Sequence, residues 1–217
     1  MEKTILFQMN ADVIAVHEKQ VGSLERVVVN PKTKVITDIV VKTGSLLDKV
    51  SKVVPIELVH ETNENQIKLS DTVDNWEDFP PLEELHLIDG NGDKSEMVED
   101  IPPVVYGNPI LGPTRVPVSM GEQPLTEMER NVPDNTVALN EHTKIITTDG
   151  KHVGNLASVL ANSAVDQVTY IGTSMGTLTK KEKLIPVKWI KEINEDEVTL
   201  RVNKESIEEL ADTLITP

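Results

Sequence analysis

A duplicated sequence pattern is the feature that most constrains what this chain can fold into. Residues 52–69 (KVVPIELVHETNENQIKL) align without a gap with residues 183–200 (KLIPVKWIKEINEDEVTL). The match keeps a lysine, a proline, an Asn-Glu turn and a final leucine, and the apolar pattern between them is also repeated. Upstream, the Val-Gly-x-Leu step at 21–24 recurs at 153–156. Such self-similarity indicates one supersecondary unit used twice, so we expect two copies of one small module.

Within each copy, the local pattern is that of short strands separated by turns rather than of long helices. Residues 24–30 and 35–42 flank Pro-Lys-Thr-Lys at 31–34, which predicts a hairpin connection. Aromatic residues make up only 3% of the chain, so the core must be built from Val, Ile and Leu, which favour strands. Many short strands in a small module predict a barrel, because closure removes exposed sheet edges. The predicted fold is therefore mainly β, with two tandem small β-barrels.

The two copies are joined by a segment that is rich in proline, glycine and charge, a composition typical of a linker. We expect a first domain at 1–88, an acidic Pro/Gly-rich linker at 89–133 and a second domain at 134–217. The first domain is predicted to end in a compact apolar tail of Trp76, Phe79, Pro80 and Pro81. The second is predicted to end in a short helix, capped by Asn203, in which a helical spacing relates Ile207, Leu210, Ala211 and Leu214.

These patterns resemble the PRC-barrel family, named for the cytoplasmic domain of the photosynthetic reaction-centre H subunit and also found in the ribosome maturation factor RimM. The resemblance covers both halves and is carried by the Val-Gly-x-Leu step, the hairpin VVVNPKTKVITDIVV, and the segments VPIELV at 54–59 and IPVKWI at 185–190. It implies a small barrel and a docking role, without shared catalytic residues. No transmembrane helix precedes either copy, unlike in the H subunit. The first half resembles a second PRC-barrel rather than the different barrel of RimM, so neither specific function is carried over.

Charge and composition exclude several classes of function. The formal net charge of -15 repels phosphate backbones, and no basic stripe offsets it, so we expect no direct contact with nucleic acid. The chain has no cysteine, which excludes disulfides, thiolate nucleophiles and cysteine-ligated metals and suits a cytoplasmic protein. No stretch approaches the roughly 18 consecutive apolar residues of a membrane span, so membrane insertion is not expected.

The sharpest catalytic signal is the sequence GTSMG at 172–176, which fits the G-x-S-x-G pattern of a hydrolase nucleophile elbow. An elbow requires a following helix, but the next residues lead into another predicted strand. In the α/β-hydrolase order the catalytic histidine follows the nucleophile, whereas every histidine of this chain precedes Ser174: His17, His60, His86, His142 and His152. We therefore interpret this segment as a glycine-rich turn and assign no catalytic residue.

One acidic segment has the spacing of a calcium loop, with oxygen ligands at Asp89, Asn91, Asp93 and Asp100. Lys94 replaces the glycine usually required at the sixth position, and no flanking helices are predicted. A solvated acidic turn is the competing interpretation, and the sequence leaves cation binding at these residues open. The histidines show no ligand-like pair, so we predict neither a metal site nor a cofactor.

The repeat also bears on function, because modules that share an activity should keep its reactive residues at matching positions. Here His17 aligns with Asp149 and His60 with Lys191, while glycines, a proline and apolar positions are kept. This pattern favours a non-catalytic protein-binding or assembly protein with a protein partner, and small modules of this kind are candidates for self-association. The alternative is a small-molecule-binding protein or an enzyme with a single site in one barrel or between the barrels.

Loops that differ between the copies are where binding residues are expected. The segments 44–51 and 172–182 occupy equivalent places before the two proline-containing strands, yet their chemistry differs. The second places Lys180, Lys181 and Lys183 close together on an acidic protein, a local charge reversal that can steer an acidic partner. We predict that these lysines are exposed and contribute to partner docking, with a solvated charge run as the alternative.

Overall fold

The chain is built almost entirely from β-strands, in a computed structural model that describes residues 4–15, 19–45, 48–70, 73, 75–88, 94–96, 125–174 and 181–214. The prediction of a mainly β protein is confirmed. The described strands form an eight-stranded, a seven-stranded and a three-stranded sheet. The strand pairings of the described residues leave both larger sheets open rather than closed into a ring.

The two halves share seven strands and one 3-10 turn in the same order. The first half has β1 (Thr4–Gln8), β2 (Asp12–Ala15), β3 (Lys19–Val29), β4 (Ile36–Ser45), β5 (Asp48–Pro55), the 3-10 turn η2 (Ile56–Leu58), β6 (Val59–Thr62), β7 (Gln66–Leu69) and the 3-10 turn η3 (Trp76–Asp78). The second half has β11 (Val137–Asn140), β12 (Lys144–Ile146), β13 (His152–Asn162), β14 (Gln167–Ser174), β15 (Lys181–Pro186), the 3-10 turn η4 (Val187–Trp189), β16 (Ile190–Ile193), β17 (Glu197–Leu200), the helix α1 (Lys204–Glu208) and β18 (Asp212–Leu214). Strands β1 to β7 thus have counterparts in β11 to β17.

The sheet topology is also shared. The seven-stranded sheet has the order β5-β4-β3-β2-β7-β6, with β11 added beside β3, and the eight-stranded sheet has the order β16-β17-β12-β13-β14-β15-β18, with β1 added beside β13. In both sheets the second strand pairs in parallel with the seventh, β2 with β7 and β12 with β17, while the remaining pairs are antiparallel. One repeat unit therefore specifies one sheet.

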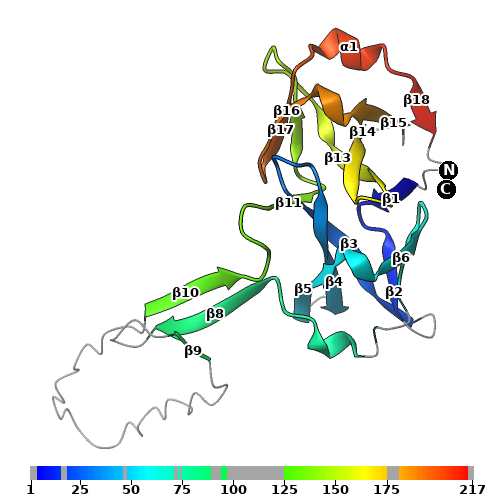
Figure 1. The fold of residues 1–217 in the computed structure, drawn as a ribbon. Helices are drawn as coiled ribbons and strands as arrows, with labels where there is room; N and C mark the ends of the chain where they lie inside the picture. The colour runs from blue at the N-terminus through cyan, green and yellow to red at the C-terminus, as the bar shows by residue number, and fades with distance from the viewer. Residues whose placement is uncertain are drawn as a thin grey trace, which may run out of the picture. The chain divides into compact units, whose positions relative to one another are not determined.

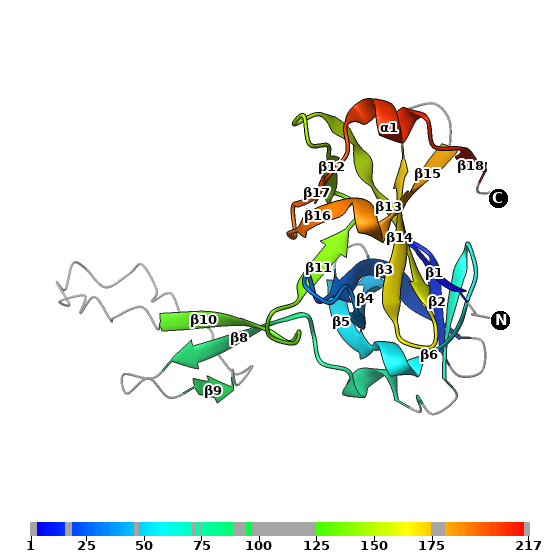
Figure 2. The ribbon, with the colours of Figure 1, turned by 45° about the horizontal axis from the view of Figure 1, so that its top comes forward.

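Each half gives its first strand to the other half. Strand β1 lies antiparallel to β13, with Phe7 opposite Val159, and β11 lies antiparallel to β3, with Leu139 opposite Val27 (Figure 1). The turned view shows the same two pairings (Figure 2). The two repeats are therefore interlocked by a reciprocal strand exchange within one chain.

The tips of the two long hairpins meet at the centre of this arrangement. The backbone N–H of Ile36 donates to the carbonyl of Asp166, and that of Val168 donates to the carbonyl of Lys34, both at 2.8 Å. The β3–β4 connection of the first half is thus joined to the β13–β14 connection of the second by equivalent hydrogen bonds. The two halves are thus related by an approximate internal symmetry in their pairings.

A single apolar core runs through both halves. Its buried members alternate with more exposed residues along β1, β7 and β17, as expected where one face of a strand is packed, whereas β3 also buries consecutive residues. Aliphatic side chains dominate, and the one fully buried aromatic side chain among the described residues is Phe7. Because Phe7 belongs to an exchanged strand, the core of the second sheet depends on a residue from the first half.

The glycine of each Val-Gly-x-Leu step is explained by the close approach of a neighbouring strand. A Cβ atom at Gly22 would lie 2.3 Å from the carbonyl oxygen of Lys42, and one at Gly154 would lie 2.4 Å from that of Ser174. Both distances are shorter than any tolerable contact, so a larger residue at either position requires the sheet to shift.

The C-terminal helix is shorter than predicted. Asn203 caps it as expected, because its side-chain oxygen accepts a 3.1 Å hydrogen bond from the backbone N–H of Ser206, and Ile207 is fully buried. The helix ends at Glu208, however, and the prediction that Leu214 continues its stripe is wrong. Leu214 lies in β18, which pairs with β15, because that strand edge offers backbone partners that a longer helix would leave unused.

Residues 83–130 form a separate, smaller unit, and residues 1–82 and 131–217 together form the larger one. The smaller unit contains an antiparallel sheet with the order β10-β8-β9, made of β8 (Glu83–Ile88), β9 (Lys94–Glu96) and β10 (Leu125–Arg130). Residues 89–93 and 97–124 of the predicted linker lie outside the described residues. The three domain ranges derived from the sequence stay a prediction.

Candidate functional site

The lysine cluster predicted to take part in docking is not an exposed group of three. Lys183 is only 8% exposed, and its ammonium group donates to the carbonyl oxygens of Glu208 and Leu210 at the end of α1. The prediction that all three lysines are exposed is therefore wrong for Lys183. Lys180 and the side chain of Lys181 lie outside the described residues, so their contribution to docking stays a prediction.

The matched lysine of the first half has the same structural role. The Lys52 ammonium group is 3.2 Å from the carbonyl oxygen of Trp76, 3.1 Å from that of Glu77 and 3.0 Å from the Glu77 carboxylate. Lys52 is also buried, at 7% exposure. In each half, this lysine holds the short helical turn that follows the last repeated strand. The match between Lys52 and Lys183 in the repeat is the sequence signal for this role.

The segment that resembles a nucleophile elbow lies at the end of β14. Ser174 is exposed and pairs with Glu182 in the β14–β15 ladder, and β15 is the next described element along the chain. Met175 and Gly176 lie outside the described residues, as do all four residues of the calcium-like loop, Asp89, Asn91, Asp93 and Asp100. Within the described ranges, no three His, Cys, Asp or Glu side chains gather as a metal site would require.

A buried carboxyl group lies close to the same loop. The Glu182 side chain is 3% exposed and accepts a short hydrogen bond from the hydroxyl of Ser158. It lies over Gly172, where any Cβ atom would collide with its carboxyl oxygen. Burial raises the pKa of Glu182, and the hydrogen bond from Ser158 opposes that shift. The pair fills the space above a glycine and is closed to solvent, so it does not form an open catalytic site.

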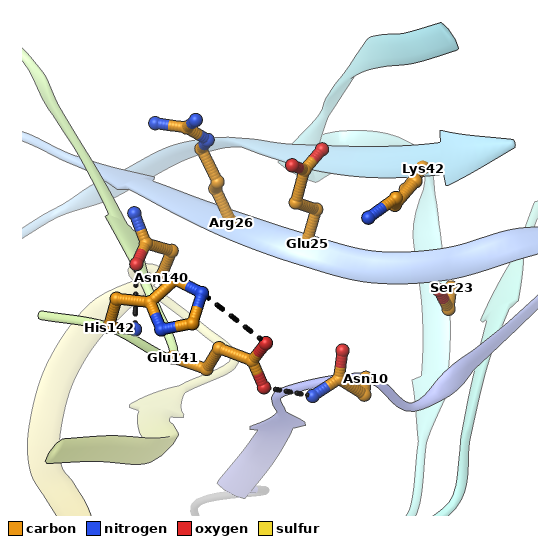
Figure 3. A pocket seen from close by; sticks show the side chains of 8 residues that line it. All are labelled: Asn10, Ser23, Glu25, Arg26, Lys42, Asn140, Glu141 and His142. Carbon is orange, nitrogen blue, oxygen red and sulfur yellow. Dashed lines mark hydrogen bonds and ion pairs between the residues drawn. The ribbon is translucent and has the colours of Figure 1, made fainter. Parts of the chain in front are cut away.

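A small polar crevice of about 110 Å³ lies where the exchanged strands meet (Figure 3). It is lined by Asn10, Ser23, Glu25, Arg26, Lys42, Asn140, Glu141 and His142. The Asn10 amide donates a 2.6 Å hydrogen bond to Glu141, whose other carboxylate oxygen is 3.7 Å from the His142 ring. Sequence reasoning missed this crevice because residues 10 and 141 come together only through the strand exchange.

The side chains that line the crevice are poorly arranged for catalysis. The His142 side chain is 84% exposed, and its ring faces the carboxylate of the neighbouring Glu141. The Arg26 Nε atom is buried without a hydrogen-bond partner, while the hydroxyl of Ser51 donates to Glu25. Two acidic and three basic side chains in so small a polar space suit a few water molecules or a small ion better than a substrate.

A second feature is an apolar row on the outer face of the eight-stranded sheet, which we call the open row. It consists of Leu6, Leu160, Tyr170 and Leu184. Tyr170 is 42% exposed, the three leucines are half-buried, and neighbouring members belong to paired strands. The core-facing residues alternate with them on the same strands, as Ile5 and Phe7 do around Leu6.

The equivalent row of the other sheet, which we call the covered row, is buried. It consists of Ala138, Val28, Asp38 and Val53, which are 3%, 0%, 8% and 3% exposed. Leu82 and Val132 pack on its aliphatic members in a small second cluster. The two outer faces are therefore related by the internal symmetry but differ in whether described residues cover them.

Comparisons with other proteins add no relative. No protein-family model matches the chain, and no curated protein matches it at a significant level. Among the described residues, no helix has the length and the apolar character that a bilayer crossing requires. Function is therefore inferred from the two rows, the crevice and the core of this chain.

Proposed function

We propose that the chain is a non-catalytic protein-docking scaffold built from two PRC-barrel-like modules, with the open row as its main docking surface. The repeat supports the two-module part of the proposal, because the segments that resemble the family occupy equivalent strands in both halves. The open row carries the docking part. Exposed apolar patches on a sheet face are typical of surfaces that bind other proteins.

The side chains of the open row support this role by their size. The covered row has Ala138, Val28 and Val53 at the positions where the open row has the larger Leu6, Leu160 and Leu184. It has Asp38 at the position of Tyr170. A sheet face in contact with water is expected to be mainly polar. The open row carries larger apolar side chains than the covered row, which is the reverse of what solvent exposure alone would favour. A surface kept for a partner explains the reversal.

The alternative of a small-molecule site or enzyme has weaker support. The crevice at the strand exchange is small and polar, and a wider, open depression of about 480 Å³ lined by Asp12, Gln20 and Lys42 among others is also mainly polar, whereas ligand pockets are mostly apolar. The core around the exchanged strands is filled by aliphatic side chains and Phe7. These features favour a protein-docking scaffold over a small-molecule-binding protein or an enzyme.

Affinity capture with a matched pair of variants tests the proposal. Tyr170→Asp places a charge on the open row, and Val165→Asp places one at an exposed turn away from it, where Val165 is 57% exposed. We expect Tyr170→Asp to lower capture of protein partners from the source cells by at least about tenfold, since buried aromatic contacts dominate interface energies. Val165→Asp should capture as the wild type does, and circular dichroism should show both variants folded.

Two results would count against the proposal. One is a wild-type chain that captures no protein above the background of an unrelated acidic protein. The other is a folded Tyr170→Asp variant that captures the same partners as the wild type at the same yield.

A further inference from the structure

We infer that the open row binds an irregular backbone segment of a separate protein, which presents neighbouring aliphatic side chains as Leu82 and Val132 do on the covered row. This inference rests on the proposed docking function and names the kind of partner. Its basis is that the chain contains the same sheet face twice, and that the described part of the chain covers only one of the two copies. The covered copy therefore shows what kind of segment such a face accepts.

The cover of the first half is held by backbone contacts to the sheet edge. The N–H of Leu82 donates to the carbonyl of Ser51 on β5 at 2.6 Å, and the N–H of Asn131 donates to the carbonyl of Leu82 at 3.0 Å. The Asn131 amide also donates to the carbonyl of Pro81 at 2.8 Å. Neither Leu82 nor Val132 belongs to a regular strand or helix. Two irregular stretches thus place one aliphatic side chain each over the row.

Among the residues that the structure describes, the second half has the edge contact but no aliphatic cover. Strand β18 pairs with β15, and Thr213 stands opposite Glu182, the position equivalent to Ser51. A polar threonine therefore occupies the register position that Leu82 has in the first half. Leu160 and Leu184 stay half-buried and Tyr170 stays 42% exposed. A segment from outside the sheet would complete the burial of all three.

The surroundings of the open row indicate an uncharged, aliphatic occupant. The described residues at flanking outward positions of the same strands are neutral: Thr4, Gln8, Asn162, Ser174 and Pro186. The one acidic side chain described on this face, Glu182, is turned onto Ser158 and is only 3% exposed. With no exposed charge among these described positions to select a charged partner, recognition falls to shape and apolar burial.

The extent of the row favours a segment over a second copy of this chain. Stable interfaces between folded proteins bury roughly 800 Å² on each partner and involve some 20–30 residues a side. The open row consists of four side chains, of which Tyr170 is exposed and the three leucines are half-buried. Such a row matches the footprint of a short loop, as the covered row does.

Site-specific photo-crosslinking in the full chain tests the inference. Tyr170 is replaced by p-benzoylphenylalanine in the source cells, and Val165 is replaced in a control chain. We expect crosslinking at position 170 at roughly tenfold higher yield than at 165, as for a central contact against an outlying one. Mass spectrometry should place the crosslink on an aliphatic residue in an irregular segment of a different protein. Leu184→Asp in the same chain should abolish it.

The other outcomes are distinguishable. A crosslink to a second copy of this chain, to a regular helix or strand, or to a charged segment would overturn the inference while leaving a docking function. Equal yields at 170 and 165 would also overturn it. If position 170 crosslinks to nothing and Tyr170→Asp leaves capture unchanged, both the inference and the docking surface are wrong.

Discussion

The strand exchange predicts that the two halves unfold as one cooperative unit. The perturbation that tests this is Phe7→Ala. Phe7 is fully buried in β1, which belongs to the first half by sequence but lies against β13 of the second. Truncating a buried phenylalanine to alanine costs about 3–5 kcal/mol. If the halves are coupled, this loss should appear in the unfolding of both.

The chain carries a reporter in each half, because one of its two tryptophans, Trp76, is in the first half and the other, Trp189, is in the second. Trp76→Phe and Trp189→Phe give two chains with a single fluorescent reporter each. We expect the two urea transitions to coincide and Phe7→Ala to shift both midpoints equally, by on the order of 1–2 M. Val165→Ala, at an exposed turn, should change the free energy of unfolding from either transition by no more than about 0.5 kcal/mol.

The reasoning is refuted if the reporters disagree. A Phe7→Ala chain in which the Trp189 transition moves and the Trp76 transition does not would show that the halves are thermodynamically independent. That result would support the two separate domains expected from the sequence, and it would mean that the exchanged strands contribute packing without coupling.

Two further predictions concern buried charged groups. Burial raises the folded-state pKa of Glu182, so ionisation of this side chain destabilises the fold. We expect Glu182→Gln to be as stable as the wild type near pH 4. As the pH rises from the ordinary glutamate pKa to the raised one, the variant should become increasingly more stable than the wild type, as measured by urea unfolding at several pH values. A stability difference that does not change with pH would contradict it. Lys183→Met leaves the carbonyls of Glu208 and Leu210 without this donor and should cost about 1–3 kcal/mol, with Lys52→Met as the matched change in the first half. A Lys183→Met chain as stable as the wild type would show that the lysine is dispensable.

Local features of this fold could be predicted from the sequence because they depend on short-range chemistry. The hairpin around 31–34, the mainly β composition and the cap at Asn203 follow from turn residues, β-branched side chains and a side-chain hydrogen bond. The repeat indicates that both halves share one strand order. These features need no knowledge of which strands meet.

The strand exchange could not be predicted, because either partner satisfies the same local pattern. Residues in β1 alternate in and out of a core whichever half supplies that core. The choice depends on the connections and on packing between the halves. The crevice around Asn10 and Glu141 depends on that choice, so the sequence could not predict it either. The predicted extent of α1 is wrong for a related reason, since the open edge of β15 competes for the residues that follow Glu208.

The lysine cluster shows how the repeat separates structural residues from functional ones. Proximity in sequence groups Lys183 with Lys180 and Lys181, but its match to Lys52 gives it the role of holding the following turn. Residues that are identical in the two copies, such as Lys52 and Lys183, therefore have a structural role that both copies share.

Comparing the two copies also indicates where function lies: at positions that are equivalent in the strand arrangement but carry different side chains. Asp38 and Tyr170 are equivalent in strand position, yet Asp38 is buried at 8% exposure and Tyr170 is 42% exposed. Burial raises the pKa of the Asp38 carboxyl, and one of its oxygens is buried without a hydrogen-bond partner. The covered face thus retains a group that would be more stable in water, and the open face retains one that would be more stable under cover. A buried carboxyl oxygen without a hydrogen-bond partner costs folding free energy, and an aromatic ring left in water gains none from burial. A partner that covers Tyr170 removes half of this mismatch, which is the physical reason to look for docking on the second sheet.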